Sequence, residues 1–271
     1  VVGAITSVLP ARVMMRLFGQ PDEDAIQCRD WATAFMLSAD LTPEERQASN
    51  EAMVQYFTDC VMDLADEEKS GKALRDGLIP AMLTAEIDGE RLTLEEVIRF
   101  CVTLVVAGAE TTTFLLANLL WYLAEMPAVR KRLIAEPDRI PAFIDESLRH
   151  SGPPQRLFRV ATRDVEIGDK QIKKGDWVAL FFGAANHDDQ VFPDPERFDL
   201  ARSNLNRQLS MGLGIHHCLG FAVAKLEAQA LVEAVLARFP SIAQGAKPPV
   251  PQQTSLLTKS FAQLFIDFGV K

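Results

Sequence analysis

The sequence predicts a mainly α protein with a minor β-sheet region. From Pro10 to about Ile134 the apolar residues recur at helical spacing, whereas residues 156–183 alternate apolar and polar side chains between turn signals. The 271 residues are 48% hydrophobic and 24% charged, which is ordinary for a globular protein. Because the chain has no internal repeat and no low-complexity linker, we predict one continuous domain. Its helical part is 1–152, and its strand-rich part, which includes a cysteine loop, is 153–271.

Helices are expected where helical spacing lies between start and stop signals. Thr42 and Glu45 form the pattern of a capping box, and Thr93 is expected to cap the longest helix. Gly19 and Pro127 are expected to end helices. The expected helical segments in this part are 10–19, 21–37, 42–71, 92–127 and 138–152.

The second part of the chain is expected to hold short strands. Gly168 and Gly175 mark turns between them. An irregular stretch at 186–208 then leads to the motif "MGLGIHHCLG" at 211–220, from which a helix runs to 240. A β-like tail closes the chain.

Composition excludes several classes of protein. The net charge of -9 argues against a nucleic-acid partner, since phosphate binding needs a basic face. The four cysteines lie far apart without a CxxC pair, which favours a reducing cytoplasm over a disulfide framework. Residues 100–124 are long and apolar enough to suggest a membrane span, but Glu110 and Asn118 within them favour a helix of a soluble core.

The cysteine in 211–220 has three possible uses: a zinc ligand, a reactive thiol, or a sulfur ligand to a larger cofactor. Zinc is disfavoured because His216, His217 and Cys218 are consecutive and no second ligand pair is near in sequence. A reactive thiol stays possible, because a helix start favours a thiolate. The surrounding glycines favour the third use, since they let the backbone approach a flat, bulky group such as a haem. They are Gly212, Gly214 and Gly220.

The stretch resembles the cysteine-loop signature of the cytochrome P450 family, F-G-x-G-x-H-x-C-L-G. Every named position agrees except the first, where Met211 stands in place of phenylalanine. The resemblance implies a cytochrome P450 fold and a haem b whose iron is ligated by the Cys218 thiolate. It also places further residues against the cofactor: Met211, Gly212, Gly214, Gly220 and Ala224.

A second motif, "AGAETT" at 107–112, lies in the longest expected helix. Glycine and clustered threonines are poor helix formers, although alone they would fit an ordinary buried helix. The motif resembles the family's distal-helix pattern A-G-x-[DE]-T. The resemblance implies that Gly108 leaves room for bound oxygen and that Thr111 holds the oxygen and its water. Glu110 is then expected to help bring in protons.

Two further motifs follow in the family's order. Glu146 and Arg149 of "ESLR" share a helix face and would alone suggest a surface ion pair. By resemblance they pair with Arg197 of "PERF" in a structural network that braces the cysteine loop. Arg159 and His216 match the family's ligands of the haem propionates, and a guanidinium suits a carboxylate.

The resemblance implies a soluble, bacterial-type, cytoplasmic and monomeric haem-thiolate monooxygenase that inserts one atom of O2 into a small apolar substrate. A separate ferredoxin-like donor and its reductase would supply electrons, and Arg207 and Lys225 could receive an acidic partner. The rivals are a peroxide-using peroxygenase, which Glu110 and Thr111 disfavour, a non-catalytic haem-binding or sensor protein, and a fragment without haem. The expected substrate wall comprises Val106, Ala107, Pro154, Gln155, Leu157, Leu256, Leu257 and Thr258.

The resemblance begins late. It covers residues from about Pro10 to Phe268, and the first third of the family's length has no counterpart. We therefore expect these residues alone to bind haem poorly, or not to fold alone.

Overall fold

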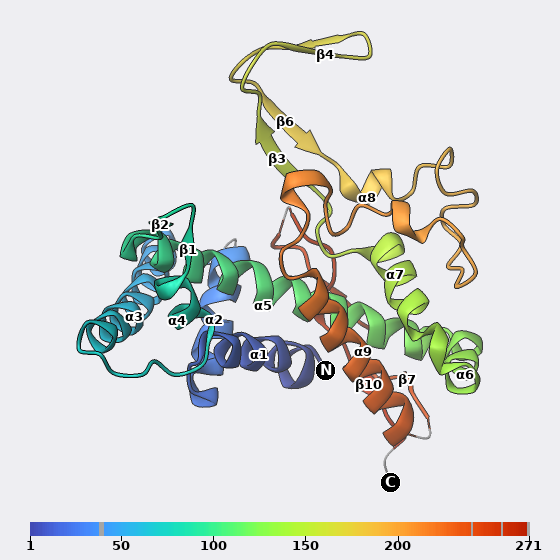
Figure 1. The fold of residues 1–271 in the computed structure, drawn as a ribbon. Helices are drawn as coiled ribbons and strands as arrows, with labels where there is room; N and C mark the ends of the chain where they lie inside the picture. The colour runs from blue at the N-terminus through green and yellow to red at the C-terminus, as the bar shows by residue number, and fades with distance from the viewer. Residues whose placement is uncertain (38–40, 240, 256, 270–271) are drawn as a thin grey trace. The chain divides into compact units, whose positions relative to one another are not determined.

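The computed structural model describes residues 1–37, 41–239, 241–255 and 257–269. These residues form mainly helices, with small two-stranded sheets (Figure 1). The fold class predicted from the sequence is confirmed. The chain divides into two compact units, Val1–Phe114 with Gln253–Ser255 and Leu115–Gln252 with Leu256–Lys271. The expectation of one continuous domain stays a prediction.

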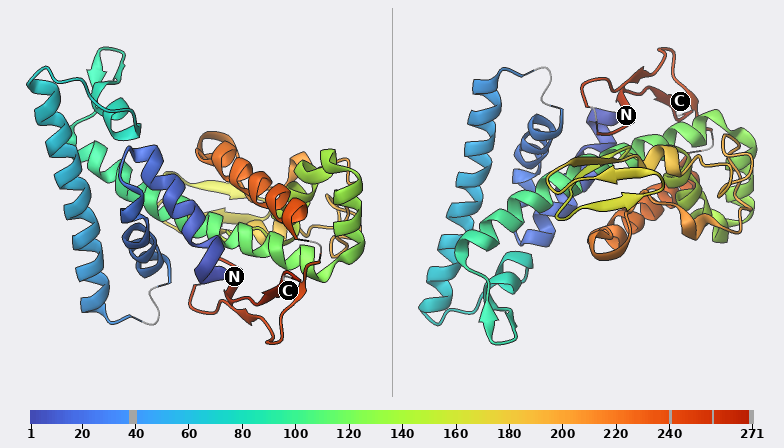
Figure 2. Two further views of the ribbon diagram at one scale, coloured as in Figure 1. Left: turned by 90° about the horizontal axis from the view of Figure 1, so that it is seen from below. Right: turned by 90° about the horizontal axis from the view of Figure 1, so that it is seen from above.

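The first unit is helical. Helix α1 packs against α2, and α2 packs against α3 (Figure 2). Phe18 meets Phe57 edge to face, with ring centroids 5.3 Å apart, and Trp31 lies 5.2 Å from Tyr56. These aromatic contacts tie the three helices into one core. The unit's elements are η1 (Val2–Thr6), α1 (Val8–Phe18), η2 (Asp22–Asp24), α2 (Ala25–Met36), α3 (Pro43–Lys69), α4 (Leu78–Thr84), β1 (Glu86–Ile87), β2 (Glu90–Arg91) and the first part of α5 (Leu94–Glu125).

The predicted helix ends are confirmed where the sequence signals are strongest. The Thr42 side chain accepts a hydrogen bond from the Glu45 N–H, and the Glu45 carboxylate accepts one from the Thr42 N–H. Thr93 makes the same reciprocal pair with Glu96 at the start of α5. Gly19 ends α1 in the left-handed conformation, with φ 77°.

The second unit contains most of the strands. The β3–β6 ladder pairs Leu157 with Leu180 and continues into the β4–β5 hairpin (Figure 1). A bridge between Pro154 and Thr258 ties the tail to the start of β3. The unit's elements after α5 are α6 (Pro127–Ala135), η4 (Pro137–Arg139), α7 (Ile140–Ser151), β3 (Leu157–Val160), β4 (Val165–Ile167), β5 (Lys170–Ile172), β6 (Trp177–Leu180), α8 (Phe182–Ala185), η5 (Leu205–Arg207), η6 (Gly214–His216), α9 (Phe221–Arg238), β7 (Ala243–Gln244), β8 (Val250–Pro251), β9 (Phe261–Gln263) and β10 (Ile266–Asp267).

Helix α5 is, among the described residues, the one helix long and apolar enough to cross a membrane. A core helix of a soluble protein passes the same test. The polar side chains of α5 have protein partners: Glu110 accepts a hydrogen bond from Thr33, and Asn118 donates one to the Ser151 carbonyl. These buried hydrogen bonds support the interpretation of α5 as a core helix.

Candidate functional site

The loop that carries Cys218 is held by its own backbone. The Cys218 N–H donates to the Met211 carbonyl at 2.7 Å, and the His217 N–H donates to the Gly214 carbonyl at 3.0 Å. Gly212 has φ 70°, and a Cβ built there would lie 3.0 Å from the His216 carbonyl oxygen. Only glycine tolerates this tight, left-handed turn easily. The turn places Cys218 three residues before the first residue of α9.

Apolar side chains around the cysteine project away from their own unit. Ile215 is 98% exposed, and Leu213 and Leu219 are 77% and 75% exposed, while Cys218 is half-buried. Large apolar side chains gathered at a surface indicate that another group covers them. The loop therefore offers a sulfur ligand within apolar surroundings.

The residues expected at the propionates also lie in the second unit. Arg159 is half-buried on β3, and its Nη1 donates to the Phe158 carbonyl at 2.9 Å. His216 is exposed at the end of η6, and Ala224 lies in the first turn of α9, where its N–H donates to the Gly220 carbonyl. Arg159 retains donors that no hydrogen bond among the described residues uses.

These residues fit the haem that the motif implies. A thiolate ligand, an apolar surface beside it and a close-approach glycine turn are what a flat, apolar iron complex requires. Arg159 and His216 could hold its propionates.

Glu146 and Arg149 form a fully buried ion pair on α7. Arg149 Nε and Nη2 donate to the two carboxylate oxygens of Glu146 at 2.7 and 2.8 Å. Arg149 Nη1 donates to the Asn186 carbonyl, and Nη2 also donates to the Arg197 carbonyl. Because neither side chain is exposed, removing Glu146 would leave the buried charge of Arg149 unpaired.

The second guanidinium of this network comes from Arg202, and not from Arg197 as expected from "PERF". Arg202 Nε lies 3.1 Å from Glu146 Oε1, and its side chain is 7% exposed. The Arg197 side chain is 65% exposed and pairs with Asp199. Arg197 takes part through its carbonyl oxygen, which accepts hydrogen bonds from both buried arginines. The turn after Asp194, which has φ 52°, directs this carbonyl inward.

A chain of hydrogen bonds links this network to the residues just before the cysteine loop. Asn186 Oδ1 accepts from the Leu209 N–H, and its amide donates to the Ser210 hydroxyl. Ser210 in turn donates to the Leu148 carbonyl on α7. A Cβ built on Gly152 would lie 2.1 Å from Ser210 Oγ, so position 152 requires glycine. The sequence motifs indicated the two ends of this series of hydrogen bonds but gave no signal for Asn186 or Ser210.

The two neighbours Glu110 and Thr111 face different surroundings in the first unit. Thr111 is half-buried, and its hydroxyl donates to the Ala107 carbonyl one turn earlier at 2.6 Å. Glu110 is buried and accepts a hydrogen bond from Thr33 Oγ1 on α2 at 3.2 Å. Burial raises the pKa of Glu110 from 4.5 to about 7, against the smaller effects of Thr33 and Arg29, which lower it. Glu110 can therefore gain and lose a proton near neutral pH.

Gly108 lies against α1. A Cβ built there would meet the sulfur of Met14 at 2.8 Å, so the helices approach closely at this glycine. The space beside Gly108 in the first unit is filled by that thioether. The expected role of Gly108, leaving room for bound oxygen, stays a prediction.

The expected substrate wall is divided between the units. Val106 and Ala107 lie on α5 in the first unit. In the second unit, the Gln155 N–H donates to the Leu257 carbonyl at 2.8 Å, beside the bridge at Thr258. Leu157 follows on β3 and is 39% exposed. Pro154 belongs to this group, whereas Leu256 lies outside the described residues.

Comparison with known proteins agrees with these motifs. The family model "Cytochrome P450" matches residues 14–142 and 140–264, so the chain belongs to the cytochrome P450 family. The putative cytochrome P450 YjiB of Bacillus subtilis is 35% identical over 93% of this chain and 64% of its own length. The mycinamicin IV hydroxylase/epoxidase of Micromonospora griseorubida is 34% identical over 88% of this chain and 58% of its own length.

The structure is also similar to a solved one. CYP109E1 from Bacillus megaterium, in complex with testosterone, matches 99% of this chain and 72% of that chain, with a TM-score of 0.88 and 31% sequence identity. The similarity confirms the cytochrome P450 fold. The chain spans less than two thirds of the length of the two curated relatives named above.

Proposed function

We propose that the protein is a haem-thiolate monooxygenase that inserts one atom of O2 into a small apolar substrate. The observation that carries the proposal is Cys218, held before α9 in a family-specific loop with apolar, exposed surroundings. Haem b, when bound, supplies the oxygen-binding and oxidising chemistry. Cys218 would supply the sulfur that ligates its iron, and the glycine turn at 212–214 would let the backbone approach it. Arg159 and His216 would hold its carboxylates, and Met211, Gly220 and Ala224 would line it.

The chain's own residues then manage protons and water. Thr111 presents a hydroxyl on the partly open face of α5 that also carries Ala107. Glu110, with a pKa of about 7, holds a proton that it can release at neutral pH. A carboxyl with a pKa near the working pH is a suitable proton donor and acceptor. We infer that Glu110 supplies protons from the α2 side and that Thr111 orients the water or oxygen that receives them.

The buried network serves positioning. Glu146, Arg149 and Arg202 hold the loop at 186–202 by hydrogen bonds. Asn186 bonds to Ser210, which directly precedes Met211 at the start of the cysteine loop. A rigid support would keep the cysteine loop in place for its ligand role.

The substrate and partner assignments follow from the same resemblance. CYP109E1 was solved in complex with testosterone, and the Micromonospora griseorubida relative is named as a mycinamicin IV hydroxylase/epoxidase. Both support a largely apolar organic substrate. Val106, Ala107, Gln155, Leu157, Leu257 and Thr258 would face it. A ferredoxin-like donor and its reductase would deliver electrons in the cytoplasm to a monomeric enzyme. Arg207 is exposed for an acidic partner, whereas Lys225 is paired with Asp145 at 2.6 Å.

The proposal is tested by the spectrum of the reduced, carbon-monoxide-bound protein. A thiolate ligand gives a strongly red-shifted Soret band, and the Cys218→Ser variant should lose that band. Turnover with a ferredoxin and reductase, but not with hydrogen peroxide alone, would support the monooxygenase. Turnover with peroxide alone would favour a peroxygenase, and the thiolate spectrum without any turnover would favour a sensor. Absence of the shifted band in the wild type would overturn the proposal.

A further inference from the structure

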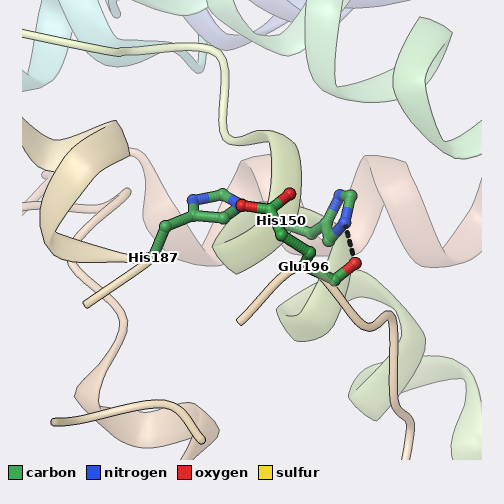
Figure 3. A group of neighbouring side chains, drawn as sticks. All are labelled: His150, His187 and Glu196. Atoms are coloured by element: carbon green, nitrogen blue, oxygen red, sulfur yellow. Dashed lines mark hydrogen bonds between the residues drawn. The ribbon is translucent and has the colours of Figure 1, made fainter. Parts of the chain in front are cut away.

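Three side chains that can bind metals lie together in the second unit. His150 is near the end of α7, His187 follows α8, and Glu196 lies in the loop at 186–208. One candidate ligand atom from each lies within 4.8 Å of the other two (Figure 3). Within the described residues, this is the one group of three or more histidine, cysteine or acidic side chains that meet in this way. Glu196 belongs to "PERF", but the hydrogen bonds of Glu146, Arg149 and Arg202 described above do not involve its side chain.

His187 is already oriented as a ligand. Its Nδ1 lies 3.0 Å from the Gly183 carbonyl oxygen, which can only accept a hydrogen bond. The ring proton therefore belongs on Nδ1, and Nε2 keeps its lone pair. Histidines that bind metals generally donate their other N–H to a carbonyl or carboxylate in this manner. Figure 3 shows the ring of His187 extending to the Glu196 carboxylate.

His150 can present a nitrogen to the same point. Its Nδ1 lies 2.7 Å from the Tyr122 hydroxyl, which donates to Ser151 Oγ at 2.8 Å. A hydroxyl that donates to Ser151 can accept a hydrogen bond from Nδ1–H. Without a metal, the Glu196 carbonyl oxygen 3.0 Å away can only accept, so the proton of the neutral ring belongs on Nε2. When a cation binds Nε2, the ring proton moves to Nδ1, where the Tyr122 hydroxyl accepts it.

The surroundings of the three side chains differ on their two sides. Phe198 packs against His150, with ring centroids 5.7 Å apart, while Glu196 is exposed. The site is therefore apolar on one side and open to solvent on the other, which gives an ion a path of entry.

We propose that His150, His187 and Glu196 bind Zn²⁺ or a similar divalent transition metal, and that the ion ties α7 to the loop at 186–208. Two imidazoles and a carboxylate are a common zinc donor set, with water or the Glu196 carbonyl as a fourth ligand. Ligand atoms about 2.0–2.1 Å from a tetrahedral zinc lie roughly 3.3 Å apart. The three ligand atoms lie within 4.8 Å of one another, so binding the ion requires them to approach by up to about 1.5 Å.

The test uses the haem-loaded protein, freed of metal with a chelator and then titrated with Zn²⁺ in competition with a chromophoric chelator. His187→Asn keeps an amide donor for the Gly183 carbonyl but removes the Nε2 ligand, and Glu196→Gln removes the charge. His217→Gln removes an exposed histidine outside the cluster and is the matched control. Unchanged far-ultraviolet circular dichroism and Soret spectra would show that each variant is folded.

We expect one equivalent of Zn²⁺ to bind to the wild type and to His217→Gln, and Mg²⁺ not to compete. His187→Asn and Glu196→Gln should each weaken binding by at least about ten-fold. X-ray absorption at the zinc edge should show nitrogen and oxygen ligands and no sulfur. The proposal is overturned if the wild type binds no zinc at a free zinc concentration 100-fold above the chelator's dissociation constant. It is also overturned if His187→Asn and Glu196→Gln both bind zinc as tightly as the wild type, or if sulfur is a ligand.

Discussion

At the scale of single residues, Glu110 and Thr111 are adjacent in the chain but have different surroundings. Thr111 bonds to its own helix on a partly open face, whereas Glu110 is buried against α2. A helix turns about 100° per residue, so neighbouring side chains necessarily point in different directions. The motif thus separates a hydroxyl on the partly open face of α5 from a carboxyl buried against α2.

The first prediction concerns the proton held by Glu110. Glu110→Gln keeps the size of the side chain but cannot release a proton, so we expect substrate hydroxylation to fall at least about ten-fold. The variant should also lose the wild type's pH dependence near 7. Thr33→Val removes the hydrogen bond that lowers the pKa of Glu110, so it should move the midpoint of that pH dependence upward. Steady-state rates between pH 5.5 and 8.5 check both expectations. A glutamine variant with the wild-type profile would contradict the assignment.

The sequence predicted some of these residues but not their partners. The motif around Thr111 pointed to Glu110, yet Thr33 is 77 positions away and no local pattern marks it. Arg202 was missed for a related reason. "PERF" directs attention to Arg197, whereas the direction of a side chain in an irregular loop depends on backbone angles such as φ 52° at Asp194. Long-range pairing and loop geometry are properties of the packed chain.

At the scale of elements, the sequence predicted the long helices well and the short ones poorly. The capping boxes at Thr42 and Thr93 have a local physical cause, and both form. Helix α5 ends at Glu125, two residues before Pro127, and Pro127 is the first residue of α6, which fits proline's preference for the first helical turn. Helices α4 and α8 and the β1–β2 hairpin were not anticipated, because segments this short carry too few periodic positions to predict a structure.

The second prediction separates the two arginines of the loop at 186–202. Arg202→Ala removes a nearly buried partner of Glu146 and its hydrogen bonds to three carbonyls of this loop, while Arg149 still pairs with Glu146. We therefore expect a loss of about 1.5–3 kcal/mol in the free energy of unfolding, together with weaker haem retention. Arg197→Ala is the matched control, because it removes an exposed side chain and keeps the carbonyl that accepts hydrogen bonds. It should cost less than about 1 kcal/mol. Chemical denaturation followed by circular dichroism measures both free energies of unfolding. If the two variants lost the same stability, the Arg197 side chain would have the bracing role expected from the sequence.

At the scale of the whole molecule, two buried carboxyls couple stability to pH. Glu227 on α9 is buried, its Oε2 has no hydrogen-bond partner within the described residues, and burial raises its pKa to about 7. Glu110 has a similarly raised pKa in the first unit. A carboxyl whose pKa is higher in the folded protein than in the unfolded chain contributes stability that is complete below about 4.5 and is lost as the pH rises through about 7.

The third prediction follows from this sign. The difference between 4.5 and about 7 corresponds to at most about 3 kcal/mol for each group. We therefore expect the free energy of unfolding to be lower at pH 8 than at pH 5, and the fall to shrink in a variant that combines Glu110→Gln with Glu227→Gln. His150 acts in the opposite direction, because its lowered pKa makes acid below about 6.5 destabilising. Subtracting the variant's unfolding curve from that of the wild type cancels this effect. If the double variant lost stability as steeply as the wild type between pH 5 and pH 8, the two carboxyls would not be the cause.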